Sequence, residues 1–257
     1  ASDGPNSVTA TQTVTVGTRI ESSFSFLVDD RAHVNGPGTS LAAIANAGTG
    51  TTRVGFDAFT GGITSVSGAT VLDRATIGGN ILSAGMNNVS GAANVSGTVT
   101  NFGVVSLPPL PTLPSFPPVT GGSLTVSSGT FTRGPGSYDT FQLNGGTLTL
   151  TGAGDYYFRS LTINNGATIR VAANARVFVL NTLVYHARFL QPTGTNTQTV
   201  TLGYAGSGSV SMEAPFNGTL VAPAASVGFG TGSGLTFTGS FFARTIEVKP
   251  ASTLVCQ

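Results

Sequence analysis

The sequence predicts an all-β fold, namely a parallel β-solenoid, most simply a right-handed β-helix, with about 18–21 residues per coil and no substantial helix. Three observations lead to this. Apolar and polar residues alternate along most of the chain, which is the period of a β-strand. Gly, Ala and Asn form short corners between strands, as in GGTLTLTGAGDYYFRSLTINNGATIRVAANARVFVLNTL (residues 145–183). The strand-and-corner phrase also returns at a nearly constant spacing, as in repeat architectures.

Residues 1–40 are expected to form an N-terminal strand arm or the first coils. The stretch VTATQTVTV (residues 8–16) alternates strictly, with threonine on one face. The other face carries Val8, Ala10, Val14 and Val16. With the alternation that follows Gly17, this strand fits either a hairpin or the first turn of the solenoid.

Residues 41–106 are expected to form the N-terminal solenoid coils. Phrases such as SLAAIANAG and NVSGTVTNFGVVSL join an apolar pair, a small-residue corner and an alternating strand. Ile63, Ile81 and Val99 are equivalent under a step of about 18 residues. Each coil would pair its backbone with the coils on either side, about 4.8 Å away.

Residues 107–120 interrupt the pattern with a proline-rich excursion. Six of the 13 prolines fall in LPPLPTLPSFPPV, and proline cannot donate to a β-ladder. Such a segment favours polyproline II and could be a linker between two solenoid parts, or a ligand for a proline-reading partner. The regular spacing of Leu110, Leu113 and Phe116 instead favours packing along the side of the rod.

Residues 121–257 are expected to form the C-terminal solenoid coils. Leu143, Leu161 and Val179 are equivalent under the same step of about 18, and later phrases fit 18–21. Ten to twelve stacked coils would make a rod on the order of 50 Å long. A β-sandwich is the alternative, because its strands alternate too, but a sandwich does not require the period.

Composition limits the class of protein. Only 8% of residues are charged and the net charge is +1, so nothing favours nucleic acid as a partner. No run of about 18 apolar residues predicts a membrane span. The start at Ala1 resembles a mature terminus after signal-peptide removal, and the lysine-poor composition agrees with a secreted or cell-surface location. One cysteine, Cys256, excludes a disulfide framework within the chain.

No catalytic, cofactor-binding or metal-binding residue is predicted, and we expect no enzyme. Asp29 and Asp30 are the only adjacent acids, and neighbours in a strand point to opposite faces. Asp155 and Glu247 are expected near corners, in solvated roles. The two histidines, His33 and His186, have no second ligand at metal spacing.

Two kinds of surface side chain could bind a ligand. Flat threonine arrays can bind ice, but an 18-residue step places Thr147 beside Asn165 and Thr149 beside Ala167, so the columns do not persist. Aromatic side chains can stack on sugars. The candidates are Tyr156, Tyr157, Tyr185 and Tyr204. Clusters such as Tyr156-Tyr157-Phe158 and Phe241-Phe242 fit core stacks between coils better.

Four phrases resemble a family of secreted bacterial β-helical surface proteins, described as uncharacterised or choice-of-anchor-like. They are YAG (residues 204–206), EAPFNGTLVAP (213–223), GSFFARTIEV (239–248) and GDYYFRSL (154–161). The resemblance covers residues 41–257 and implies an exported β-helix, with no catalytic motif. A looser similarity to bactofilins, whose short β-helices polymerise end to end, implies self-assembly, although this chain is longer.

The sequence therefore predicts a structural protein that assembles head to tail into an extracellular or cell-surface filament, because no cap helix covers either end of the chain. The first expected partner is another copy of the same chain, and the second is cell-surface or extracellular polysaccharide. Expected contacts are a donor strand at one end and the last strands at the other. Cys256 is expected to be a free thiol buried in the last coil, and if exposed it could join two chains. The residues are Val8, Ala10, Val14, Val16, Ile246, Val248, Leu254 and Cys256. The alternative is a monomeric adhesin or glycan-binding module.

Overall fold

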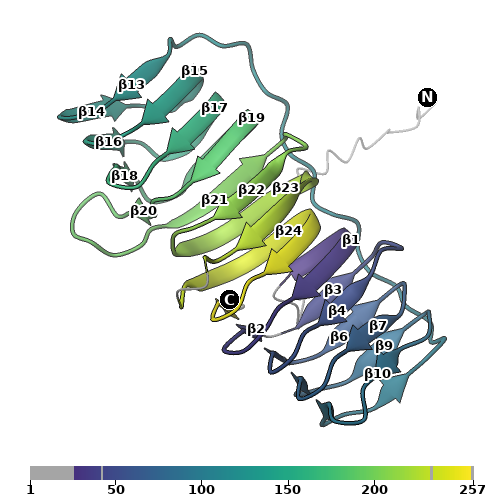
Figure 1. The fold of residues 1–257 in the computed structure, drawn as a ribbon. Coiled ribbons are helices and arrows are strands. Elements are labelled where there is room, and N and C mark those ends of the chain that lie inside the picture. Colours follow the sequence, from purple (N-terminus) through teal and green to yellow (C-terminus); the bar gives the residue numbers. More distant parts are fainter. Residues whose placement is uncertain (1–25, 42, 232–233, 256–257) are drawn as a thin grey trace, which may run out of the picture.

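The computed structural model describes residues 26–41, 43–231 and 234–255 and confirms the predicted fold class. It is an all-β solenoid of about 11 turns (Figure 1). Named strands pair with one another only in parallel, and the register shifts at a few bulges, as between Val28 and Arg31 of β1. No helix is found in these residues, so none that could cross a membrane is found in them.

The strands of the N-terminal coils are two or three residues long, except β1, which has nine. They are β1 (Phe26–Val34), β2 (Ser40–Leu41), β3 (Ile44–Asn46), β4 (Thr52–Val54), β5 (Phe59–Thr60), β6 (Ile63–Ser65), β7 (Ala69–Val71), β8 (Thr76–Ile77), β9 (Ile81–Ser83), β10 (Asn88–Val89), β11 (Asn94–Val95) and β12 (Val99–Thr100).

The C-terminal coils have longer strands. They are β13 (Leu124–Val126), β14 (Thr130–Arg133), β15 (Gly136–Leu143), β16 (Thr147–Leu150), β17 (Gly154–Ile163), β18 (Thr168–Val171), β19 (Ala175–Tyr185), β20 (Phe189–Leu190), β21 (Thr199–Tyr204), β22 (Ser209–Met212), β23 (Phe216–Phe229), β24 (Thr236–Val248) and β25 (Thr253–Val255).

The described chain begins and ends in the middle of the rod (Figure 1). From β1 the chain winds outward to one end, at β10–β12. It then crosses to the opposite end, at β13 and β14, and winds back until β24 pairs with β1 and β25 pairs with β2. The last coils therefore close on the first one, so sequence order and stacking order differ.

One core column runs through all the coils and shows why the stack is stable. Consecutive register partners in it are Val126, Leu143, Ile163, Tyr185, Met212, Phe229, Val248, Val34, Val54, Val71 and Val89. All except Val89 are almost completely buried. A single turn could not bury this apolar face, whereas stacked turns bury it continuously.

The coil length differs between the two halves. Ile63, Ile81 and Val99 are partners at a step of 18, as predicted. The predicted equivalence of Leu143, Leu161 and Val179 is wrong, because Leu143 pairs with Ile163 and Leu161 pairs with Leu183. The strands there are longer and need steps of 20 and 22. Corners such as Asn174, at φ 59°, absorb the direction change, since asparagine tolerates left-handed backbone.

The proline-rich segment packs along the side of the rod, as its leucine spacing predicts (Figure 1). Leu107, Leu110 and Leu113 cover a strip of apolar residues. That strip consists of Leu27, Ala45, Val221 and Phe242, from β1, β3, β23 and β24. Phe116 continues the line, with its ring centroid 5.6 Å from that of Tyr157. We call residues 107–116 the strap, because it spans coils of both halves.

The strap matches the solenoid in period. Its anchors recur every three residues, one turn of polyproline II, which advances about 9.3 Å. Two coil spacings are about 9.6 Å. Accordingly, Leu113 lies at Gly203 of β21 and Phe116 lies at Tyr157 of β17, two coils further on. The intervening Thr112 and Ser115 are exposed.

Part of the N-terminal core is polar. Asn46, Ser65 and Ser83 are register partners in one buried column. Asn46 Nδ2 lies 3.2 Å from Asp30 O, 3.1 Å from Gly50 O and 3.0 Å from Thr52 Oγ1, while its Oδ1 accepts from Gly48 N at 3.0 Å. This amide therefore satisfies backbone groups that an aliphatic residue would leave buried without partners.

We expect Asn46→Leu to lower the free energy of unfolding by about 2–3 kcal/mol, because it orphans these buried polar groups. Asn181→Leu is the matched control, since Asn181 is exposed and should change stability by less than about 0.5 kcal/mol. Urea denaturation followed by circular dichroism measures both. Equal midpoints for the two variants would contradict the role given to Asn46.

Candidate functional site

Three of the predicted assembly residues, Ile246, Val248 and Leu254, are described, and none of these three lies at an end of the rod. Val8, Ala10, Val14, Val16 and Cys256 fall outside the described residues. Ile246, Val248 and Leu254 are buried, and their strands have partners on both sides. The expectation that the last strands form a free end is therefore wrong, because β1 and β2 continue the stack beyond them.

The ends lie elsewhere. At the β12 end, β10, β11 and β12 pair on one side only within the described chain. At the β13 end, the same holds for β13 and β14. Such strands present unpaired backbone donors and acceptors. Apolar side chains accompany them, namely Val89, Val95, Val99 and Phe102 at the first end and Leu124 and Phe131 at the second.

A charged side chain covers part of the core at the β13 end. Arg133 pairs in register with the buried Leu150, so it occupies a core-facing position in the last coil. Its guanidinium carbon lies 5.9 Å from the centroid of the Phe141 ring, and Nη1 donates to Thr132 O at 2.8 Å. An inward charge on an edge strand limits association there.

The tyrosines do not form an aromatic binding row. Tyr156, Tyr185 and Tyr204 are buried. Tyr157 stacks on Phe178 at 5.2 Å and is covered by Phe116. Phe158, Phe241 and Phe242 are buried as well, which confirms the prediction of core stacks. Sugar binding by these rings is therefore not supported.

The threonine columns differ from those predicted. Thr147 pairs with Thr130 and Thr168, and Thr149 pairs with Thr132 and Arg170. The predicted 18-residue step is wrong here, because register partners in β16 and β18, such as Thr147 and Thr168, are 21 residues apart. One column, Thr130, Thr147 and Thr168, persists over three coils, and the other, Thr132 and Thr149, persists over two before Arg170 ends it.

The acids are dispersed and mostly paired. Arg74–Asp57, Arg159–Asp139, Arg176–Asp155, His186–Glu213 and Arg244–Asp30 lie within 4.0 Å. Across residues 26–41, 43–231 and 234–255, no three His, Cys, Asp or Glu side chains are grouped to hold a metal ion. Glu247 was expected near a corner but lies within β24, between His33 and Gly228.

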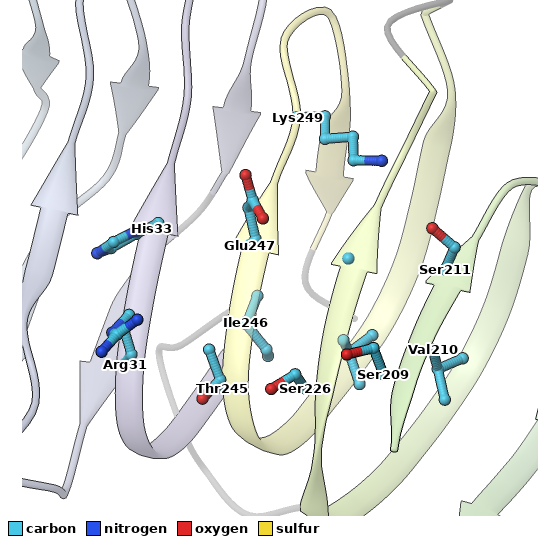
Figure 2. Close-up of a pocket in the computed structure, with 12 residues that line it drawn as sticks. Arg31, His33, Ser209, Val210, Ser211, Ser226, Thr245, Ile246, Glu247 and Lys249 are labelled. Atoms are coloured by element: carbon cyan, nitrogen blue, oxygen red, sulfur yellow. The ribbon is translucent and has the colours of Figure 1, made fainter.

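Glu247 belongs to a groove of about 420 Å³ at the junction of the two halves (Figure 2). Four adjacent strands, β22, β23, β24 and β1, contribute to it. Its outward-facing residues are Ser209, Ser211, Ser226, Gly228, Thr245, Glu247, Lys249, Arg31 and His33. We call it the junction groove. Serine and glycine on β22 and β23 keep its floor low, while longer side chains on β24 and β1 form its wall.

The electrostatics of the wall are dominated by cations. Burial lowers the pKa of His33, the neighbouring Arg31 and Arg53 lower it further, and Glu247 raises it. His33 Nε2 lies 3.1 Å from Thr51 Oγ1. Glu247 Oε1 accepts a hydrogen bond from Asn35 Nδ2 at 2.9 Å. The groove therefore suits an anion better than a cation.

Sequence reasoning missed this groove. Arg31 and His33 are more than 200 residues from Glu247 and Lys249 in the chain, and only the β1–β24 pairing brings them together. One signal was present, since Lys249 is the single lysine. A second depression, beside Thr199 and Thr201, contains one charged side chain, Arg176, which is neutralised by Asp155 at 2.6 Å.

Comparison of the chain with models of known families, with curated proteins and with solved structures finds no match. The resemblance to bacterial β-helical surface proteins and to bactofilins stays a prediction.

Proposed function

We propose that this protein is a non-enzymatic structural protein, exported from the cell, whose solenoids join head to tail into an extracellular or cell-surface filament. The observation that carries the proposal is the pair of unlike ends. Each end has edge strands with unpaired backbone groups, together with apolar side chains, within the described chain. A contact between two different ends of one molecule repeats without closing, and thereby forms a filament.

The direction of the strands supports a head-to-tail contact. All named strands pair in parallel, so a second molecule continues the ladder only when its β13 end meets the β12 end of the first. The continuous core column ends at Val89 on one side and Val126 on the other. Head-to-tail stacking would set these two valines in the same column and bury both.

Arg133 is expected to weaken the contact between the two molecules. The charge at a core-facing position would need to move aside, or find an acceptor, when a second molecule covers the end. Assembly should therefore depend strongly on protein concentration, and substitutions at the two ends should change it in opposite directions.

The test is sedimentation and electron microscopy of the full chain over a range of concentrations. We expect unbranched filaments with an axial repeat near the rod length, on the order of 50 Å. Val99→Lys places a charge at the β12 end and should abolish them. Arg133→Leu should lower the concentration needed by about tenfold, which corresponds to about 1.4 kcal/mol.

Arg188→Leu is the matched control, because Arg188 is an exposed arginine on an interior coil. It should assemble like the unaltered chain. Circular dichroism of each variant confirms that the coils are folded. Single rods at every concentration, for both the unaltered chain and Arg133→Leu, would refute the filament.

A further inference from the structure

The junction groove contains cations without acidic partners. Five ion pairs occupy other charged residues of the described chain, but Arg31, Arg53 and Lys249 belong to none of them. Arg31 and Lys249 line the groove, and Arg53 pairs in register with His33 on the next coil. In a chain with 11 lysines and arginines in total, three unpaired ones gathered on one face are a concentration of positive charge.

Glu247, the single acid among the described residues that line the groove, does not neutralise them. Glu247 accepts its hydrogen bond from Asn35, a neutral amide, at 2.9 Å. Asp30, on the same strand as Arg31, faces Arg244 at 4.0 Å. The groove therefore has a net positive wall, formed by Arg31 and Lys249, with Arg53 beside it on the next coil, even when His33 is neutral.

The floor of the groove offers hydroxyl groups on a regular spacing. Ser209, Ser226, Thr245 and Arg31 are register partners on consecutive coils, and so are Ser211, Gly228, Glu247 and His33. Neighbouring coils lie about 4.8 Å apart. A linear polymer lying along the rod axis would meet one row of hydroxyls, from Ser209, Ser226 and Thr245, and then Arg31 (Figure 2). The row beside it carries Ser211, Gly228, Glu247 and His33.

From this geometry we infer that the junction groove binds a linear acidic polysaccharide, with its carboxylate or sulfate groups against Arg31, Arg53 and Lys249 and its hydroxyls against Ser209, Ser226 and Thr245. Arginine and lysine give charge-assisted hydrogen bonds to such groups. Nucleic acid fits less well, because no Phe, Tyr or Trp among the described residues lines the groove to stack on bases. This site lies away from the rod ends, so a single molecule and a filament would both bind the polysaccharide.

The test is affinity electrophoresis of the full chain in gels containing polygalacturonate, dextran sulfate, neutral dextran or poly-dT. We expect retardation by one or both acidic polysaccharides, by neither neutral dextran nor poly-dT, and weaker retardation at high salt. Stronger retardation by polygalacturonate identifies carboxylate as the recognised group, and stronger retardation by dextran sulfate identifies sulfate.

Two variants test the groove by different means. The double variant Arg31→Gln and Lys249→Gln should weaken binding at least about tenfold by removing charge. Gly228→Val leaves the charge unchanged and fills the floor, and a Cβ at Gly228 has no neighbour closer than 3.9 Å, so the coil should fold. It should weaken binding comparably.

Arg188→Gln is the charge control and should bind like the unaltered chain. Val99→Lys separates this proposal from the filament, because it should abolish assembly and leave polysaccharide binding intact. Retardation by neutral dextran, equal retardation by poly-dT, or full binding by the double variant or by Gly228→Val would overturn the assignment of the groove.

Discussion

Replacing Gly239 with alanine is expected to destroy the cooperative folding of the central coils, with a loss of more than about 4 kcal/mol in the free energy of unfolding. Gly239 has φ 133° and pairs in register with Gly218, at φ 130°. This region of backbone conformation strongly favours glycine. A Cβ on Gly239 would also collide with the carbonyl oxygen of Gly218 in the next coil.

The neighbours of Gly239 cannot relieve this collision. Phe237 and Phe241 flank it in β24 and are both completely buried. Phe241 contacts the Phe229 ring at 4.8 Å and pairs in register with Phe26 across the junction of the two halves. A shift of β24 would therefore disturb the core on both sides of the junction.

Gly228→Ala is the matched control from the adjacent strand. A Cβ at Gly228 would make only ordinary contacts, the nearest being Ser211 Oγ at 3.9 Å. Its backbone lies outside the left-handed region, so alanine should be neutral or raise stability by up to about 1 kcal/mol. Urea denaturation measures the stability of both variants. A Gly239→Ala midpoint close to that of Gly228→Ala would contradict the prediction, because it would mean that β23 and β24 can move apart to admit the Cβ without loss of stability.

Deleting Ser115 is expected to be the second most damaging change, lowering the free energy of unfolding by about 2–4 kcal/mol. One residue fewer shortens an extended proline-rich segment by about 3.1 Å. The strap is held at its far end by hydrogen bonds from Thr120 N and Gly121 N to Ser137 O, of 3.1 and 2.7 Å. Leu113 and Phe116 then cannot both reach Gly203 and Tyr157, and at least one apolar anchor becomes exposed.

Ser115→Ala is the control for this deletion, because Ser115 is exposed and alanine preserves the length of the strap. It should leave stability within about 0.5 kcal/mol of the unaltered chain. Near-ultraviolet circular dichroism of Tyr157 and its neighbours offers a second readout, since that ring lies between Phe116 and Phe178. An unchanged midpoint for the deletion would mean that the strap contributes no stability.

The solenoid could be predicted from the sequence because its signals are local. Alternation defines the strands, Gly and Asn define the corners, and the 18-residue step from Ile63 to Val99 is a true register in the N-terminal coils. The spacing of Leu110, Leu113 and Phe116 likewise predicts a packed strap, since only contact with the rod would place an apolar residue at every third position.

Only the tertiary structure decided which coils are neighbours. A repeat period states that coils stack, but every coil offers the same backbone ladder, and the period does not say that β24 closes on β1. That one pairing moves Ile246, Val248 and Leu254 from an expected free end into the core. The free edges of the stack are instead β12 at one end and β13 with β14 at the other. Arg133 of β14 covers part of the core at this second end. The β24–β1 pairing also joins Arg31 and His33 to Glu247 and Lys249 in one groove, although almost the whole chain separates the two pairs in sequence. The sequence could not predict this groove, because charges that meet only through the fold leave no periodic pattern in the sequence.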